Sequence, residues 1–254
     1  MRRAAEVAAV VAAVLALWQG LVWATGVPPF ILPGPARVAE ALWDSRLLLA
    51  EHFTVTAAEV IAGIVLGSAL GALTAIQLMT SPGLARAVMP VLVFTQAVPV
   101  FALAPILTLW LGYGLASKIA MTLLIIYFPV ASAFIDGLRR TDPGLLDLAA
   151  TMGAGRSRTL FFLRLPAALP AFASGLRLAA VYAPIGAVIG EWVGASQGLG
   201  YLMLLANGRA KTDLMFAALI VLALMTVSLH SGVGAIGRRL DARAAGRETG
   251  GRAS

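Results

Sequence analysis

Between two long apolar runs, the chain carries the sequence DPGLLDLAATMGAGRSRTLFFLRLP at positions 142–166. Asp142 suits the N-cap of a helix that starts with Pro143, because proline has no N–H to satisfy in a first turn. Gly153 and Gly155 suit the turn that ends this helix. Four residues are spaced so that they share one apolar face: Leu145, Leu148, Ala149 and Met152.

A second short helix is expected from about Ser157, ending near Pro166 because a proline interrupts helical hydrogen bonding. Each helix is too short to span a bilayer, yet the segment is too apolar for a free loop. Residues 142–166 are called the elbow below. The elbow is predicted to be held by a partner on one side of a membrane.

Composition places most of the chain in lipid. Of 254 residues, 60% are hydrophobic and 12% are charged, whereas soluble domains have about 45–50% apolar and about 25% charged residues. The absence of cysteine excludes disulfides, thiolate metal sites and thiol catalysis. The two histidines, His52 and His230, are far apart, so no metal site and no catalytic residue is assigned.

The chain is predicted to be a single all-α membrane domain over residues 1–254, with about six spans. A length of about 20 apolar residues favours a span over a cleaved signal peptide for the first run, which follows Arg2 and Arg3. The expected spans are 4–24, 54–79, 87–111, 119–135, 168–189 and 214–236.

Three segments between or within these spans carry further expectations. Residues 36–53 predict an amphipathic helix, lying at the membrane interface or simply outside the membrane. Residues 190–213 predict a non-helical or half-inserted segment. Glycines at four-residue spacing in the second span invite close helix packing: Gly63, Gly67 and Gly71.

The positions of the basic residues predict the orientation. With Met1 in the cytoplasm, most of the 19 lysines and arginines fall on the cytoplasmic side, including those of the elbow and of the basic tail 237–254. Lys118 is expected in an outer loop. The positive-inside rule therefore puts both termini in the cytoplasm. The surplus positive charge indicates topology, and no nucleic-acid partner is expected.

The elbow resembles the cytoplasmic loop signature of ABC-transporter permease subunits. That signature reads Glu-Ala-Ala, three residues, Gly, nine residues, Ile, one residue, Leu-Pro. The matching positions here are Asp147 (for Glu), Ala149, Gly153, Leu163 (for Ile), Leu165 and Pro166. Leu148 replaces a smaller alanine, so the fit against a partner would differ in detail.

Other segments resemble one branch of that family, which imports nitrate, alkanesulfonates, taurine and thiamine precursors. They are QAVPVFALAP at 96–105, WLGYG at 110–114, GEW at 190–192 and GLGY at 198–201. The details are nearest to pyrimidine thiamine-precursor permeases. The resemblance implies a type I ABC importer permease in a bacterial inner membrane, with two copies enclosing one path. It also implies an extracytoplasmic solute-binding protein.

The chain contains no Gly-x4-Gly-Lys-[Ser/Thr] phosphate loop. No cofactor is therefore expected in this chain, and ATP is expected to bind to separate ABC ATPase subunits. The loop 137–167 is the expected coupling element between ATPase and spans, and five of its residues are assigned to coupling: Asp147, Ala149, Gly153, Leu165 and Pro166.

Ionisable and polar groups near spans are candidates for the solute path. The residues assigned to the path are Gln96, Glu191 and Tyr201. Glu191 alternatively caps the glycine-rich turn that follows it. Glu59 and Arg177 also lie in or near spans, where Arg177 is interpreted as snorkelling or as part of a structural pair. The predicted solute is a pyrimidine thiamine precursor, or a sulfonate- or nitrate-like anion.

Two other functions compete with the permease. An ion-coupled secondary transporter predicts paired carboxylates or a broken helix near the membrane midplane. A membrane scaffold without transport activity would bind a soluble partner through the elbow.

Overall fold

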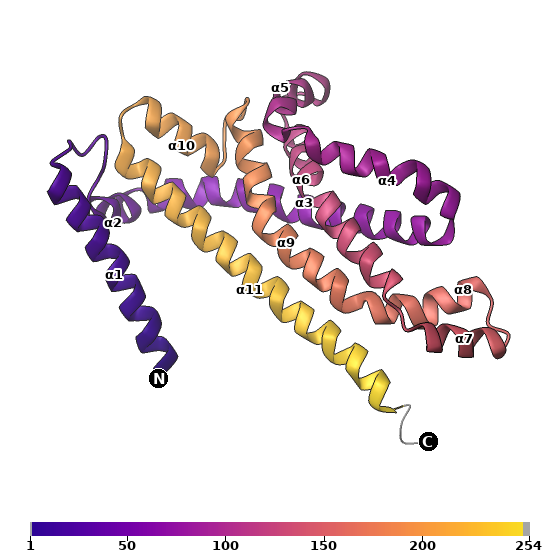
Figure 1. Cartoon of the computed structure of the whole chain (residues 1–254). Coiled ribbons are helices and arrows are strands. Elements are labelled where there is room, and N and C mark those ends of the chain that lie inside the picture. Colours follow the sequence, from indigo (N-terminus) through magenta and orange to yellow (C-terminus); the bar gives the residue numbers. More distant parts are fainter. Residues whose placement is uncertain (1, 251–254) are drawn as a thin grey trace. The chain divides into compact units, whose positions relative to one another are not determined.

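The computed structural model describes residues 2–250, and side chains within residues 5–238 (Figure 1). Helices are the only regular elements in this part of the chain, which confirms the predicted all-α class. In chain order they are α1 (Arg2–Thr25), α2 (Pro35–Asp44), α3 (Arg46–Thr80), α4 (Pro82–Ala97), α5 (Val100–Leu111), α6 (Leu115–Arg139), α7 (Pro143–Thr151), α8 (Arg156–Thr159), the π-helical turn η1 (Leu160–Arg164), α9 (Leu165–Trp192), α10 (Leu199–Gly208) and α11 (Thr212–Gly250).

Among the described residues, 5 helices are long and apolar enough to cross a membrane, or up to 6 if a bent pair counts as one span. The five lie within α1, α3, α6, α8–α9 and α11, and the bent pair is α4 with α5. Each of the six predicted spans thus has a helical counterpart.

The span expected over 87–111, with interruptions at its prolines, consists of two helices that meet at Pro99 with a bend of 101°. Pro99 lacks an N–H, and the residue before a proline is driven toward extended backbone. Val98 accordingly has φ −86° and ψ 120°. By contrast, Pro90 and Pro105 remain inside α4 and α5.

The helix expected over 36–53 is also divided, since α2 ends at Asp44 and α3 begins at Arg46. Arg46 stabilises this break: its guanidinium donates to the Trp43 carbonyl oxygen at 2.8 Å and lies 4.8 Å from the centre of the Trp43 ring. A basic side chain can satisfy the free carbonyls at a helix C-terminus in this way. Further along, the segment 190–213 contains the apolar helix α10 rather than lacking helix.

The expectation that the second elbow helix stops near Pro166 is wrong. The chain passes from α8 through η1 directly into α9, with Pro166 as the second residue of α9. A proline is tolerated in the first turn of a helix, and the π-helical turn allows α9 to begin at Leu165 without a break.

The chain forms two compact units, of which the first comprises residues up to Thr56 and Ser196–Leu224. Its core contains Val38, Leu49, Leu199, Leu202, Ala217 and Ala218. The start of α10 is capped by side chains of α3: His52 Nδ1 accepts from the Gly198 N–H at 2.9 Å, and Thr56 Oγ1 accepts from the Leu199 N–H at 2.8 Å. These contacts satisfy N–H groups that a helix N-terminus leaves free.

The second unit comprises Ala57–Ala195 and the chain from Met225 onward. Its central feature is the antiparallel packing of α6 and α9 through small residues. A Cβ added to Gly186 would lie 2.6 Å from the Thr122 Cα, and one added to Gly175 would lie 3.1 Å from the Val130 Cα. The two helices therefore approach backbone to backbone, as small residues permit in membranes.

The predicted close packing of α3 is confirmed, and its partner is α6. A Cβ on Gly71 would lie 3.2 Å from the Ala131 backbone nitrogen, and one on Gly67 would lie 2.8 Å from the Ile126 side chain. One on Gly63 would collide with the Thr122 side chain. Thus α6 is packed by glycines of both α3 and α9.

The α6–α9 contact leads to a stability prediction. We expect Gly186→Ala to lower the thermal unfolding temperature of the purified protein, because overpacking a tight contact costs roughly 1–3 kcal/mol. The matched control is Gly232→Ala, also within a helix, where an added Cβ would meet nothing within 4 Å. Equal unfolding temperatures for the two variants would contradict the close contact.

Candidate functional site

The first elbow helix, α7, is closed at both ends by its own sequence. The Asp142 carboxylate accepts from the Gly144 N–H at 2.7 Å, as an N-cap does. At the other end Gly153 has φ 75°, a conformation that glycine adopts without strain. The N–H groups of Ala154 and Gly153 donate to the carbonyls of Ala149 and Ala150 at 2.9 and 3.0 Å. This hydrogen-bond pattern is a Schellman motif, so Gly153 ends the helix as predicted, whereas Gly155 has ordinary negative φ.

Only part of the predicted apolar face of α7 is buried against the rest of the protein. Ala149 is buried, whereas Leu145, Leu148 and Met152 are 49%, 56% and 78% exposed. Asp147 is exposed beside them. Three large apolar side chains on one short helix thus have no cover within the described chain.

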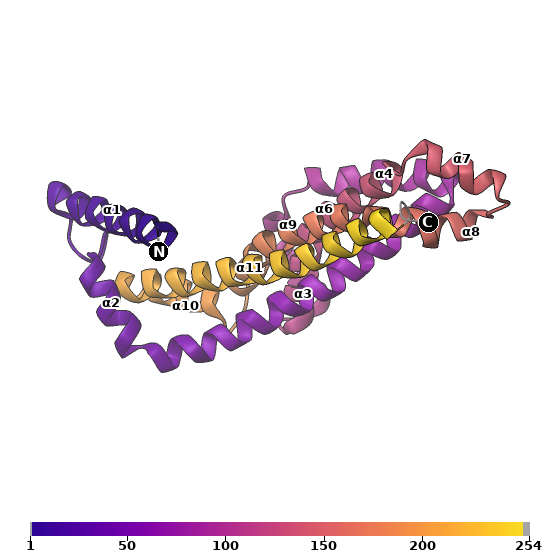
Figure 2. The same ribbon diagram turned by 90° about the horizontal axis from the view of Figure 1, so that it is seen from below.

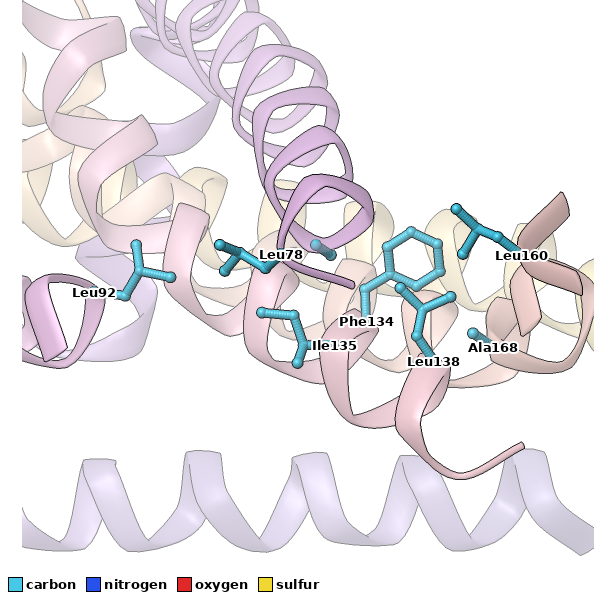
Figure 3. Close-up of a cluster of buried hydrophobic side chains, with 8 residues drawn as sticks. Leu78, Leu92, Phe134, Ile135, Leu138, Leu160 and Ala168 are labelled. Atoms are coloured by element: carbon cyan, nitrogen blue, oxygen red, sulfur yellow. The ribbon is translucent and has the colours of Figure 1, made fainter. Parts of the chain in front are cut away.

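The elbow is anchored to the rest of the second unit through a buried apolar cluster, drawn in Figure 3. Phe134 and Leu138 of α6 lie close to Leu160 of the π-helical turn and Ala168 of α9 (Figure 3). The cluster also includes Ala75, Leu78, Leu92 and Ile135. Figures 1 and 2 show α7 and α8 side by side beyond the end of α6.

A hydrogen bond adds to this anchor. Arg164 Nη1 donates to the Leu138 carbonyl oxygen at 3.1 Å, which satisfies a carbonyl in the last turn of α6. Arg164 directly precedes Leu165 and Pro166, which are both half-buried at the start of α9. These contacts connect the elbow both to α6 and to α9.

Gln96, one of the predicted path residues, lines a cavity of about 610 Å³ in the second unit. One face of α6 supplies most of the lining, with residues at helical spacing. The other lining residues are Ile125, Phe128, Pro129, Ser132, Ala133 and Asp136 from α6, with Leu178 and Tyr182 from α9. The volume lies in the range of small-molecule sites, and the cavity is an open hollow rather than an enclosed one.

The sequence reasoning missed Ser132, Asp136 and Tyr182 as lining residues. Ser132 and Asp136 are four residues apart, and therefore neighbours on one face of a helix. That spacing is a signal in the sequence, as is an acidic residue so near the end of an apolar span. The sequence alone does not show which face of α6 is hollowed.

Glu191 lies in a different place. It is buried near the end of α9, with its carboxyl beside that of Glu59. Lys118 completes the group: its Nζ forms an ion pair with Glu59 Oε1 at 2.8 Å. The expected outer-loop position of Lys118 is therefore wrong, because this residue lies inside α6 and is buried. Burial is possible because the opposite charge of Glu59 compensates its own.

Two further residues that the sequence analysis considered for the solute path do not line the Gln96 cavity. Tyr201 of α10 belongs to the first unit, where its ring lies 5.9 Å from that of His52 and lines a cavity of about 360 Å³. Arg177 donates to Ser174 Oγ at 3.0 Å within α9, which fits a structural role.

The buried Glu59–Lys118 pair leads to a second stability prediction. Lys118→Met leaves the buried carboxyls without their cation, so we expect a loss of roughly 3–5 kcal/mol in the free energy of unfolding. Replacing both partners with apolar residues of similar size is often neutral. The double variant Lys118→Met/Glu59→Met should therefore unfold at a higher temperature than Lys118→Met alone. If it unfolds at a lower temperature, Lys118 stabilises the fold by some route other than this pair.

Comparison with known proteins gives a family match over most of the chain. Residues 60–245 match the model of the family described as "Binding-protein-dependent transport system inner membrane component". The matched region includes the elbow, the Gln96 cavity and Lys118 of the buried ion pair. Glu59, the partner of Lys118, directly precedes the first matched residue.

Three curated relatives align over most of their length. A probable ABC transporter permease protein of Haemophilus influenzae is 49% identical, over 88% of this chain and 91% of that protein. The formylaminopyrimidine transport permease protein ThiX of Halalkalibacterium halodurans is 38% identical, over 78% and 80%. The riboflavin transport system permease protein RibX of Chloroflexus aurantiacus is 37% identical, over 89% and 85%.

A solved structure shows the same fold. A chain of the MetNI methionine ABC transporter, in an inward-facing conformation, superposes with a TM-score of 0.61 at 19% identity, covering 80% of this chain and 95% of that chain. Together with the family match, this establishes the architecture of an ABC importer permease. The chain belongs to the family of binding-protein-dependent transport system inner membrane components.

Proposed function

We propose that this chain forms the translocation path of an ATP-driven importer and takes its driving force from separate ATPase subunits that bind the elbow. Two copies enclose one path for a small polar solute, and an extracytoplasmic binding protein delivers that solute. The family match supports the permease role. The finer statements rest on the geometry of the elbow and of the Gln96 cavity.

The observation that carries the proposal is an exposed apolar face on an anchored helix. Leu145, Leu148 and Met152 project from α7 without cover, while the opposite side of the elbow is fixed by the cluster around Phe134 and Leu160. Large apolar side chains that are rigidly presented are suited to fill a pocket on a partner protein. The proposed partner is an ATPase subunit in the cytosol.

The same contacts explain how motion would reach the membrane. A force on α7 passes to α6 through the Arg164–Leu138 hydrogen bond and the apolar cluster. It passes to α9 directly, because η1 leads into α9 without a loop. Because packed helices move as rigid bodies rather than deform continuously, displacement of α7 would move α6 and α9, which line the Gln96 cavity.

The roles of the other partners follow from charge and sequence. The chain has no phosphate loop of the Gly-x4-Gly-Lys type, so ATP binding is assigned to the ATPase subunits. The arginines of the elbow support a cytoplasmic position for α7 and for both termini. The binding protein then docks on the opposite face of the membrane.

An ion-coupled secondary transporter is less well supported. It requires carboxylates or a broken helix that coordinate an ion near the membrane midplane. The break between α4 and α5 falls at the apolar residues Val98 and Pro99. The carboxyl pair of this chain, Glu59 and Glu191, already holds a cation in Lys118. Lys118 lies in the first turn of α6 and Glu191 in the last turn of α9. The charged group therefore lies toward the ends of these two spans.

The proposal predicts that a charge on the exposed apolar face of α7 weakens ATPase binding. We expect Leu148→Glu to weaken co-purification of the ABC ATPase subunit from the same source by about tenfold or more. A loss of this size is typical when a hot-spot residue of an interface is replaced. Solute-stimulated ATP hydrolysis in proteoliposomes should fall in parallel, with unchanged thermal stability of the isolated permease.

The control is Ala150→Glu on the same helix. Ala150 is exposed, and two residues of helical rotation put it on roughly the opposite side from Leu148. This variant should keep the ATPase bound. If both variants bind the ATPase as the native chain does, α7 is not the docking element.

A further inference from the structure

The charges that line the Gln96 cavity restrict the solute that it can hold. Among its described lining residues, Asp136 is the one formally charged side chain, and neither lysine nor arginine is present. The other polar groups are the amide of Gln96 and the hydroxyls of Ser132 and Tyr182. Positive charge or several converging donors favour a sulfonate or nitrate, whereas this cavity offers one amide and two hydroxyls beside a carboxylate.

The position of Asp136 makes its charge effective within the cavity. The residue is exposed on the hollowed face of α6. Arg139 and Arg140 follow it three and four residues later, but among the described residues neither forms an ion pair with it. Ser132 lies one turn before it, which puts their Cβ atoms about 5–6 Å apart. At that range a unit charge acts strongly on a solute beside Ser132, because interactions near a protein surface are screened less than in bulk water.

We infer that Asp136 makes this cavity selective for uncharged or cationic organic solutes and excludes organic anions. This inference rests on the proposed function, since it takes the Gln96 cavity as part of the path. It separates the two solute classes suggested by the sequence, favouring an amino-substituted heterocycle over a sulfonate or nitrate. Phe128 and Tyr182 supply apolar walls to the same cavity.

The absence of cysteine from the chain permits a direct test. Ser132→Cys is introduced, and the permease in complex with its ATPase is placed in lipid nanodiscs. The thiol is reacted separately with a trimethylammonium-ethyl and a sulfonato-ethyl methanethiosulfonate, two reagents of opposite charge. Each rate is divided by the rate of the same reagent with 2-mercaptoethanol. We expect the normalised cation-to-anion ratio to be about tenfold.

Two further variants assign the effect to Asp136. Adding Asp136→Asn should bring the normalised ratio close to one, by slowing the cation and accelerating the anion. Adding Asp44→Asn removes a carboxylate that does not line this cavity, so the ratio should remain high. Gln96→Cys provides a second reporter on α4, for which the same order of rates is expected.

Three results would overturn the inference. One is a ratio near or below one in the chain that keeps Asp136, and another is a high ratio that persists in Asp136→Asn. The third is that neither reporter thiol reacts with either reagent, which would show that the cavity does not admit solutes. Because the labelling needs no ATP hydrolysis and is repeated on the permease alone in nanodiscs, ATPase docking can fail while the charge preference holds, or the reverse. The two proposals are therefore separable.

Discussion

The backbone-to-backbone contact of α6 with α9 is the constraint on which the second unit depends. Gly175, Gly186 and Gly190 leave no room for side chains against α6. Small residues allow this approach in lipid, where dispersion contacts rather than exclusion of water hold helices together. Near one end of the contact, Gly190 lies against Lys118, which pairs with Glu59. Near the other end, Leu138 and Ala168 form the cluster that anchors the elbow.

The same contact explains why the Gln96 cavity and the elbow occur in one compact unit. The face of α9 that meets α6 is rich in glycine and alanine. An adjoining face of α6 carries Phe128, Ser132 and Asp136 toward the cavity. The elbow connects the neighbouring ends of the two helices, with η1 leading into α9. A displacement of α7 therefore has a short, fully packed route to the cavity walls.

The sequence predicted the helices better than their ends. Hydrophobic runs and the capping signals at Asp142 and Gly153 depend on local chemistry, and both appear in the structure. Proline was a poorer guide, because its effect depends on position. Pro99 separates two helices bent by 101°, whereas Pro166 lies in the first turn of α9 and does not end a helix.

The sequence grouped candidate site residues only where they are close along the chain. The elbow is contiguous, so its apolar face could be predicted from spacing alone. Lys118 was assigned to a loop because its partner, Glu59, lies on another helix and nothing local indicates the pair. Asp136 was missed for a related reason: helical spacing groups it with Ser132, but the contacts of α6 decide which face is hollowed.

The central claim is that the elbow moves as part of the α6–α9 body when the partner binds ATP. The most direct measurement uses a spin label at Thr151→Cys, exposed on α7 of this otherwise cysteine-free chain. In the assembled transporter, double electron–electron resonance gives the distance between the labels of the two copies. The account predicts one narrow distance without nucleotide and a different narrow distance with ATP bound. An unchanged distance in an assembled, ATP-bound transporter would contradict it.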